Sequence, residues 1–207
     1  MPIQLSTTSL MKSFQRRTIF RDVSFIVEEG QTLLITGKNG SGKSTLAKIL
    51  SRLLSPTSGT LDLTVNGSHI DELHWNDHIG FVSPYVQLYE EFSANENLAL
   101  ALSLRGRPPE PQRAGDLLTM VSLTPRAGDP LRAFSSGMKQ RTKFAFALMH
   151  KPKVLILDEP MTNLDAEGIA MVREIMERQR REGILIVATN DESDVATPEV
   201  RVNLDAH

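Results

Sequence analysis

The chain begins with patterns typical of β-strands. Apolar and polar residues alternate along IQLSTTSL (residues 3–10) and RDVSFIVEEG (21–30), which predicts two strands with one buried face each. Three other runs are apolar without alternation, as in strands buried on both faces of a parallel sheet: QTLLITG (31–37), VLILDE (154–159) and ILIVAT (184–189). Three further short strands are predicted: TLDLTVNG (60–67), HIGFVS (78–83) and VRVNLDAH (200–207).

Helical spacing appears between these strands. STLAKILSRLL (44–54) predicts an amphipathic helix after the first buried strand, and EGIAMVREIMERQRREG (167–183) predicts another between the last two buried strands. From about residue 84 to 150 the pattern is helical throughout, interrupted by the turn signals RPPEPQ and TPRAGDP. The sequence therefore predicts an α/β protein, a single domain over residues 1–207, whose β/α core is interrupted by a helical insertion at about 84–150.

Composition narrows the possible functions. The 207 residues are 40% hydrophobic and 23% charged, which is ordinary for a globular protein, and the net charge of −2 gives no general attraction to nucleic acid. Cysteine is absent, which excludes disulfides, thiolate metal sites and cysteine nucleophiles and agrees with a cytoplasmic protein. The first residues lack a signal-peptide pattern, and no run of about 18 apolar residues occurs. A partner would therefore have to provide any membrane span.

A glycine-rich segment follows the first buried strand and precedes the first helix, the order that a phosphate-binding P-loop requires. The glycines let consecutive N–H groups point at phosphate oxygens, and the helix N-terminus adds its dipole. Lys43 is expected to neutralise the β- and γ-phosphates, the hydroxyl of Ser44 to bind Mg²⁺, and Thr45 to reach the α-phosphate. The predicted nucleotide-binding residues of this segment are Gly37, Asn39, Gly40, Ser41, Gly42, Lys43, Ser44 and Thr45. The alternative is an ordinary glycine-rich turn.

Two carboxylates end the buried strand VLILDE. We expect Asp158 to hold Mg²⁺ through its water shell and Glu159 to polarise the water that attacks the γ-phosphate. We also expect the carboxyl end of this strand to lie next to the point where the first buried strand leads into the P-loop. The alternative is a solvated acidic turn.

The segment Phe134 to Arg141, FSSGMKQR, resembles the signature motif of the ATP-binding cassette (ABC) proteins, usually LSGGQ. With the P-loop before it and DEPMTNLD after it, the resemblance covers nearly the whole chain, with all motifs in the family's order. It implies a P-loop NTPase fold with a RecA-like core sheet, an antiparallel β subdomain and an inserted α-helical subdomain. It also implies that the cofactors are ATP and Mg²⁺, and that two cassettes close head to tail around two ATP molecules.

The resemblance also suggests roles for four residues outside these loops. Ser135 and Gly137 would bind the γ-phosphate held by the other subunit, and a serine cap with a free helix N-terminus is a suitable anion site; the alternative is a plain helix cap. Phe14 would stack on adenine, unless it is a core residue. Asp165 would lie in the loop that crosses the dimer interface, and it could also cap the following helix.

Two positions depart from the family pattern. Asn190 stands where the family has a histidine that contacts the γ-phosphate; an amide can donate a hydrogen bond there but cannot take up a proton. We still expect Asn190 to be catalytic. Pro84 stands where the family has a glutamine that touches Mg²⁺, so a ligand shifted to Ser83 or Gln87 is an open alternative. Both changes put the rate and coupling of hydrolysis in question more than ATP binding.

Other polar clusters carry weaker signals. His69, His74 and His78 lack the convergent carboxylates of a metal site, so we expect surface histidines. The basic residues of MKQRTKFAFALMHKPK have helical spacing, so a solvated helix face is expected in place of a nucleic-acid stripe.

Two functions remain. The first is the ATPase subunit of a membrane transporter: a homodimer on the cytoplasmic face of the inner membrane, docked on separate integral membrane subunits through residues 84–150. The short length and the FSSGMKQR form resemble bacterial exporter-type ATPases, including the haem-exporter ATPase of cytochrome c maturation. The second is a soluble ABC protein outside transport, or a slowly hydrolysing regulatory switch. The sequence does not identify the transported substrate or the direction of transport.

Overall fold

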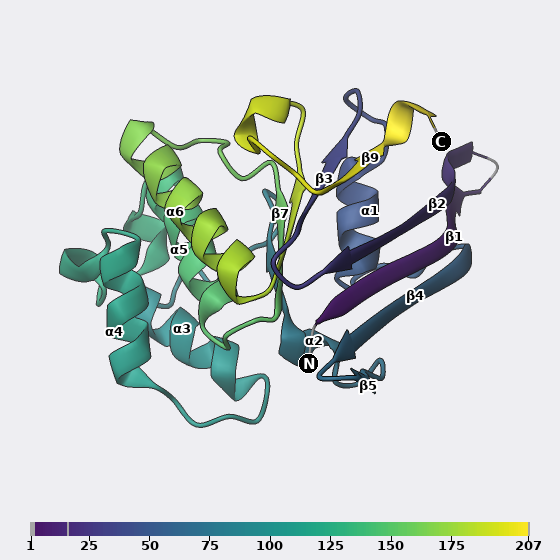
Figure 1. Ribbon diagram of the computed structural model, residues 1–207. Helices are drawn as coiled ribbons and strands as arrows, with labels where there is room; N and C mark the ends of the chain where they lie inside the picture. Colours follow the sequence, from purple (N-terminus) through teal and green to yellow (C-terminus); the bar gives the residue numbers. More distant parts are fainter. Residues whose placement is uncertain (1–2, 16, 207) are drawn as a thin grey trace.

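The structure, a computed structural model, describes residues 3–15 and 17–206, and its strands form two sheets (Figure 1). The antiparallel sheet has the order β2-β1-β4-β5 and the parallel sheet the order β6-β7-β8-β3-β9. The strands of the first are β1 (Gln4–Phe14), β2 (Arg17–Glu28), β4 (Ser58–Val65) and β5 (Ser68–His69). Those of the second are β3 (Thr32–Thr36), β6 (Ile79–Val82), β7 (Val154–Asp158), β8 (Ile184–Ala188) and β9 (Val200–Asn203).

The helices follow the strands in the expected order. Helix α1 (Lys43–Leu50) comes after β3, α2 (Trp75–His78) precedes β6, and α6 (Ala166–Glu182) connects β7 to β8. Between β6 and β7 lie α3 (Ala94–Ser103), α4 (Pro111–Met120) and α5 (Ser136–Leu148), which gather on one side of the parallel sheet in Figure 1. Short 3₁₀ turns occupy Thr124–Arg126, Leu131–Ala133, Glu192–Asp194 and Leu204–Ala206.

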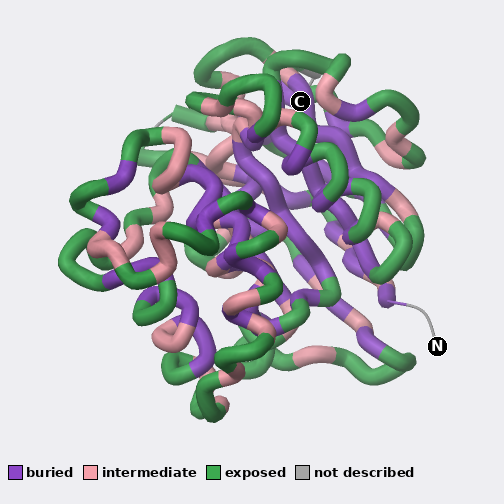
Figure 2. The backbone as a smooth tube through the Cα atoms, turned by 90° about the vertical axis from the view of Figure 1, so that its left-hand side faces the viewer, coloured by how far each residue is buried: buried purple, intermediate pink, exposed green. Residues whose placement is uncertain are grey.

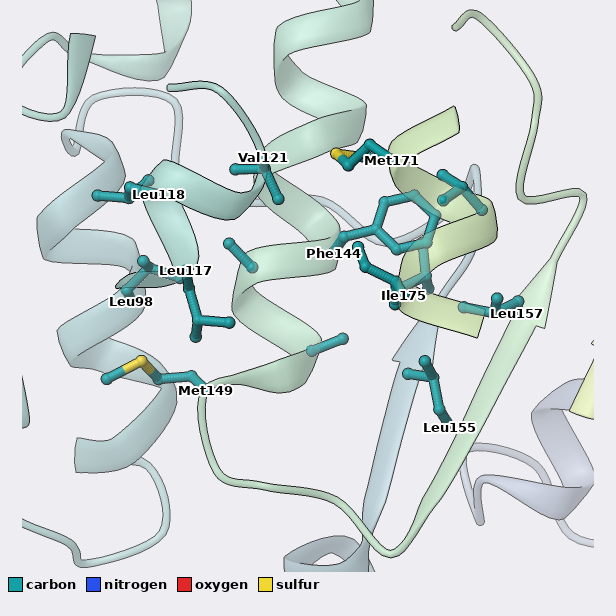
Figure 3. Packing of buried hydrophobic residues seen from close by; sticks show 14 of the residues in the cluster. Leu98, Leu117, Leu118, Val121, Phe144, Met149, Leu155, Leu157, Met171 and Ile175 are labelled. Atoms are coloured by element: carbon teal, nitrogen blue, oxygen red, sulfur yellow. The ribbon is translucent and has the colours of Figure 1, made fainter. Parts of the chain in front are cut away.

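Each face of the parallel sheet has its own hydrophobic core, because successive side chains of a strand point to opposite faces. Leu33 and Ile35 of β3 pack with α1 and the antiparallel sheet, whereas Leu34 packs with the helices α3 to α6. In the second core the ring of Phe144 lies beside Ile175 (Figure 3). The central strands are accordingly buried along their length (Figure 2). The two cores pack against both faces of the sheet and thereby fix the position of its carboxyl edge, where β3, β7 and β8 end.

The expected elements are confirmed, with changes at their ends. The first strand is longer than predicted and runs to Phe14. The predicted helix 44–54 ends at Leu50, whose carbonyl accepts a hydrogen bond from the buried indole of Trp75 at 3.0 Å, and Arg52 then has φ 58°. The chain from 84 to 93 contains no helix, and the last strand stops at Asn203. The fold class itself agrees with the prediction: a parallel sheet, an antiparallel sheet and helices inserted between β6 and β7.

The strand order of the parallel sheet decides what lies between the P-loop and the two carboxylates. The strand that carries Asp158 does not lie next to β3, because β8 lies between them and pairs with both in parallel. The end of β8 therefore comes between the P-loop and the two carboxylates, and the residue that follows Thr189 there is Asn190. The strand order, which the sequence does not reveal, places Asn190 at the centre of the site.

Candidate nucleotide site

A glycine-rich loop joins β3 to the first turn of α1. Gly37, Gly40 and Gly42 have φ of 144°, 83° and 106°, values that other residues rarely adopt. A Cβ on Gly42 would lie 2.5 Å from Cγ2 of Ile19, so a side chain has no room there. Gly42 is also the N-cap of α1 and provides no side-chain hydrogen bond, so the first N–H groups of the helix remain available to an anion.

The ammonium of Lys43 lies inside this loop. It donates hydrogen bonds to the carbonyls of Gly37 (2.8 Å) and Lys38 (3.2 Å) and to Oδ1 of Asn190 (2.5 Å). Asn190 in turn donates from Nδ2 to Oδ1 of Asn39 at 2.7 Å. All three oxygens that face the ammonium are neutral, and a charged phosphate is a stronger partner. The network therefore suits a lysine that exchanges these oxygens for a phosphate.

A second polar atom of the loop also fits a phosphate. Oγ of Ser41 is buried and has no hydrogen-bond partner among residues 3–15 and 17–206. A buried hydroxyl without a partner costs about 1–3 kcal/mol, so a phosphate oxygen at this point would relieve a real cost. Thr45 is half-buried in the first turn of α1.

The carboxylate of Asp158 is fully buried beside α1. Its Oδ1 accepts a hydrogen bond from Oγ of Ser44 at 3.0 Å, and its Oδ2 accepts one from Oγ of Ser83 at 3.1 Å. Burial raises the pKa of Asp158, while the two serine hydroxyls lower it. Within the described part of the chain no three His, Cys, Asp or Glu side chains converge on a metal site. One carboxylate and one hydroxyl are instead the donor set of an Mg²⁺ that keeps several waters and binds substrate phosphates.

Glu159 occupies an unusual backbone conformation directly after β7. Its φ is 49°, which is uncommon for a residue with a side chain, and its N–H donates to the carbonyl of Ala188 at 2.8 Å. Burial raises the pKa of Glu159, Lys43 lowers it, and Asp158 raises it further. Non-glycine residues held at positive φ occur often in active sites, where the surrounding structure fixes a side-chain direction. A partly buried carboxylate with a raised pKa is suited to accept a proton.

The signature segment begins a helix, as predicted. Ser135 is the N-cap of α5 and accepts a hydrogen bond from the N–H of Met138 at 3.2 Å, while Ser135 and Ser136 are exposed. A Cβ on Gly137 would lie 3.2 Å from the carbonyl oxygen of Asn163, so glycine permits close approach of the loop after β7. Ser135 thus caps the helix, and the exposed cap leaves the helix N-terminus accessible to a ligand.

Asp165 caps the next helix. Its Oδ1 accepts hydrogen bonds from the N–H of Gly168 and from Nη2 of Arg141, both at 2.8 Å. Arg141 also donates to Oε1 of Glu167 at 3.3 Å. These bonds lower the pKa of Asp165, with the Gly168 N–H as the largest cause. The expected capping role is confirmed, and Arg141 ties α5 to the start of α6.

Phe14 is not a core residue. It ends β1 with 47% of its surface exposed, and Nζ of Lys12 lies 4.9 Å from the centre of its ring. The core alternative is therefore wrong, and a ring face is available for stacking.

Pro84, which stands where the family has a glutamine, lies outside the metal site. Pro84 is exposed and contributes only its carbonyl, which accepts from Nζ of Lys143 at 3.1 Å. Gln87 is also exposed and lines a cavity of about 370 Å³ with Leu131 and other residues, away from Asp158. Of the two candidates for a shifted ligand, only Ser83 contacts the carboxylate of Asp158.

The structure agrees with the prediction for two of the histidines but not for two of the basic residues. His69 and His74 are exposed, as expected, each beside an aspartate. The prediction of a solvated basic helix face is wrong for Arg141, which is 9% exposed, and for Lys143, which is half-buried. Both cations have found oxygen partners on segments distant in the sequence.

One residue of the site gives no signal in the sequence. Asp205 accepts hydrogen bonds from the N–H of Lys38 at 3.0 Å and 3.2 Å and so supports the P-loop from the end of the chain. It is brought there by the pairing of β9 with β3, and no motif surrounds it.

Known proteins share both the sequence and the fold of this chain. Residues 20–162 match the family model described as ABC transporter. The chain is 37% identical over 188 residues to the uncharacterized ABC transporter ATP-binding protein YxlF of Bacillus subtilis, covering 90% of this chain but only 62% of that protein. It is 36% identical over 200 residues to the lipoprotein-releasing system ATP-binding protein LolD 1 of Chlorobium chlorochromatii, covering 91% of this chain and 81% of that protein.

A solved structure agrees with this relationship. An ATP-binding cassette determined as a dimer in a post-hydrolysis state with ADP and Pi superposes with a TM-score of 0.81 at 24% identity, over 96% of this chain and 93% of the other. At that identity the likeness supports the fold, and the family follows from the sequence matches. The chain belongs to the ABC transporter family, as an ATP-binding domain.

Proposed function

We propose that the chain is the ATP-binding and ATP-hydrolysing subunit of a membrane ABC transporter whose transmembrane subunits are separate chains. The observation that carries the proposal is the gathering of Lys43, Ser44, Asp158 and Glu159 around the carboxyl edge of one sheet. The positive charge of Lys43 lowers the pKa of Glu159, so the two side chains interact within one site. This arrangement provides a cation for phosphate, a metal site and a base, which are the requirements of phosphoryl transfer to water.

The chain's own residues divide the work. Lys43 leaves the carbonyls of the loop and neutralises the β- and γ-phosphates of ATP, while the uncapped N–H groups at the start of α1 bind phosphate oxygens. Ser44 and Asp158 would hold Mg²⁺, which would supply Lewis-acid stabilisation of the phosphate charge. Glu159 orients the attacking water and accepts its proton. Asn190 directs its amide at the γ-phosphate, in place of a histidine.

Other residues would act at the edge of the site and across a subunit boundary. Phe14 stacks on the adenine. In a homodimer, Ser135 and Gly137 of one copy bind the γ-phosphate held by the other copy, and Asp165 lies at the boundary. The exposed N-terminus of α5 supports this assignment.

The names of two relatives support the proposed partners. Two of them are named as ATP-binding proteins of transport systems, and no helix in the described residues is long and apolar enough to cross a membrane. We place the dimer on the cytoplasmic face of the inner membrane, docked on integral membrane subunits through residues 84–150. Co-purification with an integral membrane protein would support this placement, and capture of a soluble partner alone would contradict it.

The second candidate is a slow regulatory ATP switch, favoured by Pro84 and by the contact of Asn190 with Lys43. The test is steady-state Mg·ATP hydrolysis by the purified chain, by Glu159→Gln and by the double variant Pro84→Gln/Asn190→His. Turnover by the wild type but not by Glu159→Gln supports the transporter ATPase. Turnover by the double variant alone supports the switch.

A further inference from the structure

Ser83 is a buried hydroxyl with a specific partner. It is 0% exposed, and its Oγ donates to Oδ2 of Asp158 at 3.1 Å, while Oγ of Ser44 donates to Oδ1. Both oxygens of this buried carboxylate are therefore occupied, one from α1 and one from the end of β6. Burying a hydroxyl without a partner is costly, so the bond to Asp158 is what makes serine favourable at this buried position.

The strand pairing fixes where this hydroxyl lies. Strands β6 and β7 pair in parallel, with Val82 opposite Leu157. The next residue of each strand continues the register, which sets Ser83 against Asp158 at the carboxyl edge of the sheet. Its position thus comes from two buried strands, and it does not depend on an exposed loop.

The backbone around Ser83 is held from a third side. Nζ of Lys143 on α5 donates to the carbonyl of Ser83 at 3.2 Å and to that of Pro84 at 3.1 Å. The N–H of Tyr85 points at Oγ of Ser83 at 3.3 Å. Lys143 is half-buried, which makes its two contacts less screened than those of a surface lysine. The turn after β6 is therefore anchored to the helix that begins at Ser135.

We propose that Ser83 is a positioning residue for Mg²⁺, acting through Asp158. Its hydrogen bond to Oδ2 fixes the orientation of the carboxylate that, with the hydroxyl of Ser44, would hold Mg²⁺. Pro84 has no side-chain group for this task, and the cavity that Gln87 lines does not include Asp158 among its lining residues. Hydrogen bonds that orient a metal-binding carboxylate contribute about 10–100-fold to metal affinity in proteins. The proposal rests on the proposed function, because it assumes that Mg²⁺ and ATP bind at this site.

The test is metal binding, measured apart from catalysis. We would titrate Mn²⁺ into the purified full chain with ATP and count free Mn²⁺ by electron paramagnetic resonance, for the wild type, Ser83→Ala, Ser83→Thr and Gln87→Ala. We expect Ser83→Ala to weaken Mn²⁺ binding about 10-fold. Ser83→Thr, which keeps the hydroxyl, and Gln87→Ala, which removes an exposed amide, should stay within about threefold of the wild type.

ATP binding in EDTA separates the possible failures. With Ser83→Ala we expect metal-free ATP affinity equal to that of the wild type, because Ser83 does not contact the P-loop. Unchanged Mn²⁺ affinity, or an equal loss of metal-free ATP affinity, would overturn the proposal. A wild-type chain that binds no ATP at all would instead refute the proposed function. If Ser83→Ala does not fold, Lys143→Met loosens the same turn from outside, and an unaltered Mn²⁺ affinity in that variant counts against Ser83.

Discussion

Asn190 joins Lys43 to Asn39: its side-chain oxygen accepts from the lysine ammonium, and its amide nitrogen donates to the asparagine. Lys43 has to leave this oxygen to reach a phosphate. The amide oxygen is neutral and gives up the ammonium to a phosphate at little cost, whereas a charged group in its place should oppose nucleotide binding.

The first prediction compares two variants of Asn190. Asn190→Asp places a carboxylate against Lys43, which ties down the ammonium and repels the phosphates, so we expect ATP affinity to fall at least about 10-fold. Asn190→Ala removes the contact without adding charge and should keep affinity within about threefold of the wild type. Calorimetric titration with a slowly hydrolysed ATP analogue measures both. Equal affinities of the two variants would show that a negative charge at position 190 does not oppose binding.

Phe14 is expected to supply a stacking surface. Because its ring is 47% exposed, Phe14→Ala should change the free energy of unfolding by less than about 0.5 kcal/mol. Loss of base stacking should nevertheless weaken ATP binding about 10-fold, since one stacked base contributes about 1–3 kcal/mol. Phe14→Tyr keeps a ring and should bind as the wild type does. Ile26, exposed on the same sheet, offers the control Ile26→Ala; if that variant loses as much affinity as Phe14→Ala, the ring is not the cause.

Hydrolysis should depend on the protonation of Glu159. Burial raises the pKa of this carboxylate above its ordinary value of 4.5. A base must be deprotonated, so kcat/KM should decline as the pH falls through this raised pKa, and the midpoint of the decline should lie above 4.5. The fluorescence of the single tryptophan, Trp75, reports folding over the same range. An acid limb that persists in the residual activity of Glu159→Gln would assign the titration to another group.

His150 should make the fold sensitive to acid. Burial, together with Arg105, lowers the pKa of His150 from 6.5 to about 3, and Nε2 donates to the carbonyl of Ile79 at 2.9 Å. Below pH 6.5 His150 is protonated in the unfolded chain, whereas in the folded chain it stays neutral down to about pH 3. The free energy of unfolding should therefore decrease as the pH falls through this window, by up to about 1.4 kcal/mol per pH unit.

His150→Gln provides the matched test, because its amide can donate to Ile79 without titrating. Urea denaturation at pH 7.5 and pH 5 should show a smaller loss of stability in this variant than in the wild type. If His150→Gln is as acid-sensitive as the wild type, the dependence arises elsewhere.

The site was predictable from the sequence wherever a motif and its flanking elements lie close together in the chain. Lys43, Ser44 and Asp158 could be assigned because parallel strands end at one edge of a sheet. The position of β8 between β7 and β3 could not be predicted, because the order of strands in a sheet differs from their order in the sequence. Local periodicity also misjudged Arg141 and Lys143, whose partners are distant in the sequence. Asp205 reaches the P-loop through strand pairing alone.

Arg141 has a mechanical consequence. It fastens α5 to the cap of α6 through Asp165 and Glu167, and Gly137 brings the same two segments into close approach at Asn163. These contacts link the two segments to one another, so two copies that met through one segment would also meet the other.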